Sequence, residues 1–146
     1  SGLDSLRSIS PESIHFSFSN AVLEHVRKND FESFCEALFS AHIRGSISTH
    51  QVDYKDHLGG SLNNLRFPGS IWESRFFSND GFYTNRLRHS EVMRYFRNSG
   101  FVILKESVHS WDALPLHQKS MAAEFQFMED SDLRVCDSFI TLQKPA

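Results

Sequence analysis

Residues 14–26 read IHFSFSNAVLEHV, from Ile14 to Val26. The alternation of apolar and polar residues through Phe18 predicts a β-strand over 14–18, followed by a short helix that begins at Asn20. The first turn of that helix carries an acid, Glu24, and an imidazole, His25. Ligands bind at strand-to-helix junctions of open α/β sheets, because the loops at the carboxyl ends of the strands form a crevice. This stretch therefore predicts an α/β fold with a ligand site at the end of the strand.

The residues that follow predict about three further strands with helices between them. Apolar spacing favours a helix from Asp30 to about His42, ended by Gly45, and a strand over 46–52 that is parallel to the first because a helix separates them. Residues 53–89 have little periodicity, so we expect a long ordered excursion, which is usually functional in compact domains. The remaining expected elements are short helices near 62–65 and 70–74, a helix over 90–98, a strand over 101–108, a helix from Pro115 to about 127 and a strand over 133–143.

Composition excludes several classes of partner. The chain has 146 residues, of which 40% are hydrophobic and 23% charged, and a formal net charge of -3. We expect no nucleic acid and no membrane as a partner, because phosphate-rich surfaces are held by clustered Lys and Arg, and no apolar run approaches the length of a membrane span. The two cysteines, Cys35 and Cys136, lie in apolar contexts, so we expect reduced thiols and a cytoplasmic location.

Two stretches carry a resemblance to a known family. Residues 19–26, SNAVLEHV, resemble the fourth-strand motif of class I S-adenosylmethionine-dependent methyltransferases. A second stretch is similar to the loop after the fifth strand in a bacterial-type subfamily; it runs from Val52 to Phe67 and continues in Trp72-Glu73-Ser74 and in residues 81–86, GFYTNR. The family's Gly-rich first turn and the acidic residue that ends its second strand are missing.

The resemblance implies a fold and a domain organisation. Residues 1–146 are expected to form a single truncated domain, the C-terminal half of a Rossmann-like methyltransferase sheet. About four strands are implied, the last antiparallel and inserted between its two predecessors, with helices on both faces. Residues 53–89 correspond to an acceptor-side loop. The chain alone is expected to bind no S-adenosylmethionine and to be inactive, because the cofactor-binding half is absent.

The resemblance also assigns candidate roles. Ser19, Asn20, Ala21 and Leu23 are expected beside the cofactor, and Glu24 and His25 where cofactor and acceptor meet. His25 is a candidate general base for a hydroxyl or amine, because its ordinary pKa lies near neutrality. The competing interpretation is a carboxylate favoured by the helix dipole beside a locally hydrogen-bonded histidine. Polar groups of the excursion suit a polar or sugar-like acceptor, and the candidates are Asp53, His57, Asn63, Asn64, Arg66, Tyr83, Asn85 and Arg86.

Three hypotheses for the function remain open. The first is a methyltransferase fragment. The second is a non-catalytic interaction module, in which the strand over 14–18 has an unpaired edge that a second copy of the chain covers, since proteins rarely leave such edges exposed. The third is a small metal-dependent enzyme built on His50, Asp53, Asp56 and His57, whose side-chain types bind divalent cations. Their spacing fits no standard structural zinc signature, so no metal site is predicted.

Overall fold

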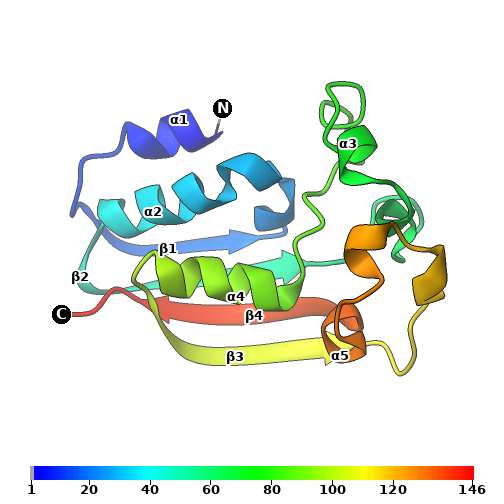
Figure 1. Cartoon of the computed structure of the whole chain (residues 1–146). Helices are drawn as coiled ribbons and strands as arrows, with labels where there is room; N and C mark the ends of the chain where they lie inside the picture. The colour runs from blue at the N-terminus through cyan, green and yellow to red at the C-terminus, as the bar shows by residue number, and fades with distance from the viewer. Residues whose placement is uncertain (1) are drawn as a thin grey trace.

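A computed structural model describes residues 2–146 as one four-stranded sheet with helices packed against it (Figure 1). The strands are β1 (Ile14–Asn20), β2 (His42–Asp53), β3 (Val102–Ser110) and β4 (Val135–Gln143), in the order β1-β2-β4-β3. β1 and β2 are parallel, and β4 runs antiparallel to both of its neighbours, β2 and β3. The predicted strands, and the antiparallel last strand between its two predecessors, are confirmed.

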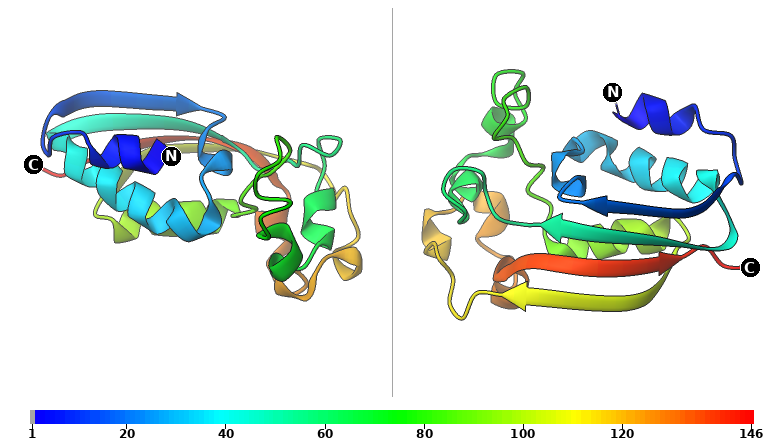
Figure 2. Two further views of the ribbon diagram at one scale, coloured as in Figure 1. Left: turned by 90° about the horizontal axis from the view of Figure 1, so that it is seen from above. Right: turned by 180° about the vertical axis from the view of Figure 1, so that it is seen from behind.

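The helices cover one face of the sheet. Figure 2 shows α1 (Gly2–Arg7), α2 (Phe31–Ala41) and α4 (His89–Asn98) on the same side of the strands. The prediction of helices on both faces is wrong for residues 2–146. The reason is topological: α2 and α4 belong to crossovers that advance in one direction across the sheet, and right-handed crossovers in one direction place their helices on one side. None of these helices within residues 2–146 is long and apolar enough to cross a membrane.

The covered and uncovered faces differ in burial. Beneath α2 and α4 lies a core that includes Phe31, Phe96 and Ile140, each fully buried. On the strand β1, the rings of Phe16 and Phe18 belong to the uncovered face and are 56% and 75% exposed. One face of the sheet therefore forms the hydrophobic core, and the other presents aromatic side chains to solvent.

A second unit, which we call the end cap, lies at the carboxyl ends of β1, β2 and β3 (Figure 1). It comprises residues 54–88 and 111–134 and has its own apolar cluster around Leu62, Leu65 and Phe125. Its short elements are η3 (Asn63–Arg66), α3 (Gly69–Trp72), η4 (Gln118–Ser120), η5 (Ala123–Phe125) and α5 (Asp130–Leu133). The two short helices expected in the excursion are present, close to their predicted positions.

Two predicted helices are absent as such. The segment after Asn20 forms only the 3-10 turns η1 (Leu23–His25) and η2 (Lys28–Asp30), because Ala21 has a positive φ of 51° and Arg27 is extended. The segment after Pro115 forms only η4 and η5. There the Gln118 amide donates to the carbonyls of Phe125 and Met128, at 3.1 and 2.8 Å, so a side chain takes the place of helical hydrogen bonds.

The prediction that Gly45 closes this helix is also wrong, although the helix ends within a residue of the predicted His42. α2 ends at Ala41, and Gly45 lies inside β2 with a φ of +77°. The pairing of β1 with β2 is irregular between Ile14 and Phe16, opposite this part of β2. Gly45 therefore allows the long strand to bend, because glycine adopts a positive φ that is unfavourable for other residues.

Candidate functional site

The candidate site lies where β1 ends and the η1 turn begins. Ala21, with its positive φ, turns the chain out of the strand, and its N–H still donates to the carbonyl of Gln51 on β2 at 3.1 Å. A non-glycine residue in this conformation carries backbone strain, which is concentrated at functional sites. The turn places Glu24 and His25 at the carboxyl edge of the parallel pair β1 and β2.

Asn85 of the end cap holds this turn in place. Its side-chain amide donates to the carbonyls of Leu23 and Val26, at 2.9 and 2.8 Å, and its backbone N–H donates to the carbonyl of Glu24 at 2.7 Å. Its side-chain oxygen accepts from the N–H of Leu87 at 3.0 Å. The amide of Asn85 is thus used to fix the site, with no donor left for a ligand.

His25 is exposed and has one ring nitrogen committed. Its Nδ1 lies 3.0 Å from the carbonyl oxygen of Tyr83. Because a carbonyl only accepts, Nδ1 carries the proton, and in the neutral ring Nε2 has the lone pair. The ring of His57 lies 5.0 Å from that of His25, centroid to centroid. The η1 turn therefore presents an imidazole in the tautomer that can accept a proton at Nε2.

Glu24, the neighbouring residue, is buried without a partner. Its side chain is 3% exposed, and neither carboxyl oxygen has a hydrogen bond within residues 2–146. Burial raises the pKa of Glu24, while its own backbone N–H and the charge of His25 act in the opposite direction. The charge of Asp53 adds to the increase in the pKa. A buried acid of this kind holds its proton more strongly than a solvated one.

Ser19 lies at one end of a continuous chain of hydroxyl and imidazole groups between β1 and β2. The successive contacts are Ser19 Oγ to His50 Nδ1 (2.7 Å), His50 Nε2 to Ser48 Oγ (2.8 Å), Ser48 Oγ to Ser17 Oγ (2.6 Å), Ser17 Oγ to His42 Nε2 (2.8 Å), His42 Nδ1 to Ser46 Oγ (2.8 Å) and Ser46 Oγ to the Ile43 carbonyl (2.6 Å). The chain packs under Phe96, whose ring stacks on that of His50 at 5.3 Å.

Donor counting fixes the direction of this chain from its Ile43 end. The hydroxyl of Ser46 donates to the Ile43 carbonyl, so its oxygen accepts from the Nδ1–H of His42. Burial lowers the pKa of His42, so the ring is neutral and has one N–H. Its Nε2 must then accept from the hydroxyl of Ser17.

The same assignment of donors continues from Ser17 to Ser19, at the candidate site. Since Ser17 donates to His42, its oxygen accepts from Ser48, and Ser48 accepts in turn from the Nε2–H of His50. Burial lowers the pKa of His50 to about 4, so this ring is neutral too, and its Nδ1 accepts from the hydroxyl of Ser19. The Ser19 proton is therefore committed inward, and its oxygen is left as an acceptor at the strand end.

The other cofactor-side candidates behave differently from one another. Asn20 and Ala21 are exposed at the end of β1, whereas the side chain of Leu23 is fully buried in the core beneath the helices. Of the four residues, Ser19, Asn20 and Ala21 thus present polar or backbone groups at the strand end. Leu23 supports the turn from below.

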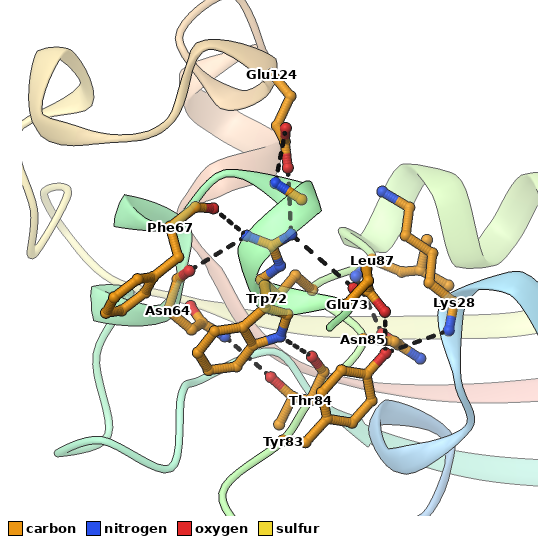
Figure 3. A network of polar contacts seen from close by, with 12 residues as sticks. Lys28, Asn64, Phe67, Trp72, Glu73, Tyr83, Thr84, Asn85, Leu87 and Glu124 are labelled. Carbon is orange, nitrogen blue, oxygen red and sulfur yellow. Dashed lines mark hydrogen bonds and ion pairs between the residues drawn. The ribbon is translucent and has the colours of Figure 1, made fainter. Parts of the chain in front are cut away.

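Arg86 is the centre of a buried network in the end cap, and its partners Asn64, Phe67, Glu73 and Glu124 are labelled in Figure 3. Its guanidinium donates to the carbonyls of Asn64 and Phe67, at 3.3 and 2.6 Å, and to Oε1 of Glu124 at 3.2 Å. It also lies 5.4 Å from the centroid of the Trp72 ring. Desolvation by burial lowers the pKa of Arg86, and the surrounding carboxylates act against that change. Arg86 holds loops together and has no face free for an acceptor.

Tyr83 and Asn64, two further acceptor-side candidates, are also used internally. The Tyr83 hydroxyl donates to Glu73 Oε2 at 2.7 Å, and burial raises its pKa. The Asn64 amide donates to Thr84 Oγ1 at 2.9 Å. By contrast, Arg66 and His57 are exposed, and Asn63 is only partly buried. The structure therefore brings His57 beside His25 and leaves Asn63 and Arg66 at the surface of the end cap.

The four residues of the metal hypothesis are engaged separately. His50 belongs to the hydroxyl–imidazole chain, and Asp53 pairs with Lys55 at 3.0 Å. The buried Asp56 carboxylate accepts from the backbone N–H groups of Leu58, Ser61 and Asn63. No group of three or more His, Cys, Asp or Glu side chains suited to a metal ion occurs within residues 2–146. The structure gives the metal-dependent hypothesis no support.

Sequence reasoning missed the role of Ser17, His42, Ser46 and Ser48. The signal was present: polar residues recur with period two at 46, 48 and 50 and again at 17 and 19, on strands whose same face must be buried. Buried polar groups need partners. Such a repeat on two adjacent parallel strands predicts that the two rows pair with each other.

Comparison with known proteins identifies the fold. No protein-family model and no curated protein matches the sequence. Among solved structures, an S-adenosylmethionine-dependent methyltransferase from Methanosarcina mazei is 14% identical with a TM-score of 0.60, over 94% of this chain and 62% of that one. A chain in the complex of the Haloferax volcanii Trm112 methyltransferase activator with a putative methyltransferase is 14% identical with a TM-score of 0.55, over 95% of this chain and 57% of that one.

A third likeness separates fold from reaction. The [4+2]-cyclase SpnF is 13% identical with a TM-score of 0.56, over 97% of this chain and 55% of that one. The chain thus spans between 55% and 62% of the length of these three structures. Together the likenesses show a class I methyltransferase fold. They do not fix the chemistry, because a fold hosts more than one reaction.

Proposed function

We propose that this chain is the C-terminal part of an S-adenosylmethionine-dependent methyltransferase domain, which in its complete form transfers a methyl group to a hydroxyl or amine of a small-molecule acceptor. The observation that carries the proposal is the pair at the end of β1: a buried carboxyl, Glu24, beside an imidazole, His25, whose lone pair is at Nε2. The fold shared with methyltransferases supports it.

In this proposal His25 is the general base. Its Nε2 accepts the proton of the acceptor hydroxyl or amine, and the Tyr83 carbonyl stabilises the imidazolium at Nδ1. Glu24, buried beside it, adds a favourable charge when it is ionised. The cofactor, when bound, supplies an electrophilic methyl group. Alignment of acceptor and methyl carbon contributes much of the rate in such a transfer, so the rigid hold of Asn85 on the turn matters as much as the base.

The residues at the strand end fit one wall of the cofactor site. Ser19 has a hydroxyl oxygen that can only accept, which suits an ammonium group such as that of the cofactor's amino-acid part. Asn20 and Ala21 offer amide and backbone groups beside it. On the acceptor side, His57, Asn63 and Arg66 keep polar groups that are at least partly exposed. The carboxylate of Asp53 forms an ion pair with Lys55. A sugar-like acceptor would have to be held by these residues, since Asn64, Tyr83, Asn85 and Arg86 are used within the fold.

Isothermal titration with S-adenosylmethionine tests the cofactor assignment. We expect no measurable binding by this chain alone and saturable binding by a protein extended with the residues that precede it in its gene. In the extended protein, Ser19→Ala should weaken the affinity about tenfold or more, because a bond to a charged group is lost. Ser107→Ala, on exposed β3, is the matched control. Tight binding by the chain alone, or none by the extended protein, would overturn the proposal.

The base is tested separately. In the extended protein, His25→Gln should lower kcat by roughly 100-fold or more while leaving cofactor affinity unchanged. A locally structural histidine would instead lower stability and leave the rate per folded molecule unchanged. An unaltered kcat assigns His25 to the structural role and removes it from the mechanism.

A second candidate function, an interaction module that forms a homodimer, is favoured by β1. This strand is an edge of the sheet, with β2 as its neighbour on the other side and the exposed Phe16 and Phe18 rings on its uncovered face. Unpaired strand edges beside apolar rows are templates for association. One structure of this fold contains a protein activator, which supports a protein partner of some kind.

Light scattering tests the dimer. We expect a mass of two chains, and Phe18→Lys should return it to one. Phe127→Lys, at a ring that is 93% exposed in the end cap, is the matched control and should leave the dimer intact. A stable monomer of the unaltered chain would rule out self-association through β1.

A further inference from the structure

A cavity of about 580 Å³ opens beside His25, between α1, the start of α2 and the η1 turn. We propose that it binds a small molecule with an apolar body and a hydroxyl group, which makes this molecule the class of acceptor for the site described above; the acceptor role, though not the binding, rests on the proposed methyl transfer. The volume lies in the range of about 300–1,000 Å³ that is typical of small-molecule sites.

The walls of the cavity are mostly apolar. The apolar part of the lining consists of Leu3, Leu6, Ile9, Val22, Val26 and Phe34, and the remaining lining residues are Gly2, Ser5, His25, Arg27 and Asp30. Val22 is about half exposed, as expected of a residue at the mouth of a cavity, and Leu6 and Phe34 are partly buried against the main core. Burial of such surface by a ligand is favourable in proportion to the apolar area removed from water. The walls therefore select an aromatic or alkyl body.

His25 supplies the polar contact. Its ring lines the same cavity, and its Nδ1–H is committed to the Tyr83 carbonyl, so Nε2 is the nitrogen left to accept. A wholly apolar occupant would desolvate this nitrogen without giving it a donor, which is costly. A hydroxyl on the ligand donates to Nε2 and removes that cost. This requirement also disfavours an apolar protein segment as the occupant.

The polar side chains of the end cap are not available to a ligand in this cavity, and this favours an apolar ligand over an oxygen-rich one. The amide, phenol and guanidinium groups of Asn64, Tyr83, Asn85 and Arg86 donate hydrogen bonds within the fold. Arg27, which also lines the cavity, donates to the side-chain oxygen of Asn79 in the end cap at 2.6 Å. The lining also includes the polar side chains of Ser5 and Asp30, but six of its eleven residues are apolar, which favours a ligand with an apolar body over an oxygen-rich one.

Two probes that differ by one hydroxyl test the proposal: 2-naphthol and naphthalene, titrated into the chain and followed by the NMR signals of the cavity methyl groups. We expect both to shift the signals of Val22, Val26 and Leu6, with 2-naphthol binding about fivefold more tightly, the effect of one hydrogen bond. His25→Phe should make the two affinities equal. His15→Phe, the same change at an exposed position on β1, should preserve the preference.

A blocking variant locates the site. Val22→Trp adds bulk at the exposed mouth of the cavity without disturbing the core, and it should reduce the affinity for both probes at least tenfold. Binding that survives Val22→Trp, or equal affinities for the two probes in the unaltered chain, would overturn the proposal. These titrations need no cofactor. Loss of the methyltransferase assignment would leave probe binding intact, and loss of probe binding would leave the cofactor titration unaffected.

Discussion

The sheet layer, formed by β1–β4 with α2 and α4, and the end cap are stabilised by different means. In the sheet layer the backbone groups pair with one another, and apolar side chains such as Phe96 and Leu142 fill the space beneath the helices. In the end cap, irregular backbone carbonyls are bonded by buried cations: Arg88 alone donates to the carbonyls of Tyr54, Leu133 and Val135. Where the backbone forms no regular helix or sheet, side chains must supply the hydrogen-bond partners of its buried N–H and C=O groups.

The largest expected effect follows from removing one of these cations. Arg86→Met keeps an unbranched apolar stem but removes the guanidinium, and it leaves Glu124 and two backbone carbonyls without their donor. We expect the free energy of unfolding to fall by about 4 kcal/mol, mostly from the two carbonyls that lose their donor, because the Glu124 side chain is 42% exposed and water can solvate it. Arg66→Met, at an exposed position of the same loop, should cost less than about 0.5 kcal/mol. Urea denaturation measures both.

Hydrogen exchange then tests whether the two regions are separate units. If they are, Arg86→Met should speed exchange of end-cap amides more than that of amides in β2 and β4. Equal acceleration in both regions would mean that the chain unfolds as a single unit, and the comparison would lose its basis.

The next effect concerns the sheet layer. Leu142 is fully buried on β4, between the two strands that β4 joins. Leu142→Ala should cost about 3 kcal/mol, the sum of lost burial and a residual cavity. Exchange should accelerate in all four strands. The exposed Leu104→Ala on β3 is the control, with a cost of less than about 1 kcal/mol. A response confined to β4 would contradict a single cooperative sheet layer.

The contrast also explains what could be predicted from the sequence. The strands and the helices α2 and α4 have apolar residues at spacings of two or of three to four, and those patterns placed each of them within a few residues. The segment after Pro115 has apolar residues at helical spacing as well, but Leu116, Met121 and Phe125 pack in the end-cap cluster instead. Periodicity reports that a side chain is buried. It does not report which core buries it.

The candidate site was predicted in part. The junction at Glu24 and His25 was located from the strand-to-helix pattern and from the family resemblance. The commitment of Asn85 and Arg86 to carbonyls far away in the sequence, over separations of 62 and 19 residues, was not visible. In the sequence, polar residues of an aperiodic loop look like ligand-binding residues. Only the structure shows which of them bond to backbone carbonyls instead.

A smaller effect is expected at Glu24, the one carboxyl of the site that no described residue bonds. Its pKa is raised by burial, so the folded chain holds this proton more tightly than the unfolded chain does. The free energy of unfolding should therefore fall as pH rises from about 4, the ordinary range of a glutamate, through the folded pKa. Glu24→Gln removes this titration.

The Glu24→Gln variant should equal the unaltered chain near pH 4 and exceed it at pH 7.5, by about 1 kcal/mol in urea denaturation, because a buried charge without a partner is costly. Glu129→Gln, at an exposed acid of the end cap, should keep the decline of the unfolding free energy with pH, because Glu24 is still present. A variant that is less stable than the unaltered chain at pH 7.5 would mean that the ionised carboxylate has a partner in solution.

The smallest effect leaves stability unchanged and tests the hydroxyl–imidazole chain, the one place where the sheet layer uses polar groups as the end cap does. Donor counting gives the two rings opposite tautomers: His42 protonated at Nδ1 and His50 at Nε2. Nitrogen-15 shifts of the imidazoles at pH 7 should show this pair, with both rings neutral, because burial lowers both pKa values. If both rings share one tautomer, the chain is broken at a hydroxyl, and the Ser19 oxygen is no longer constrained to accept.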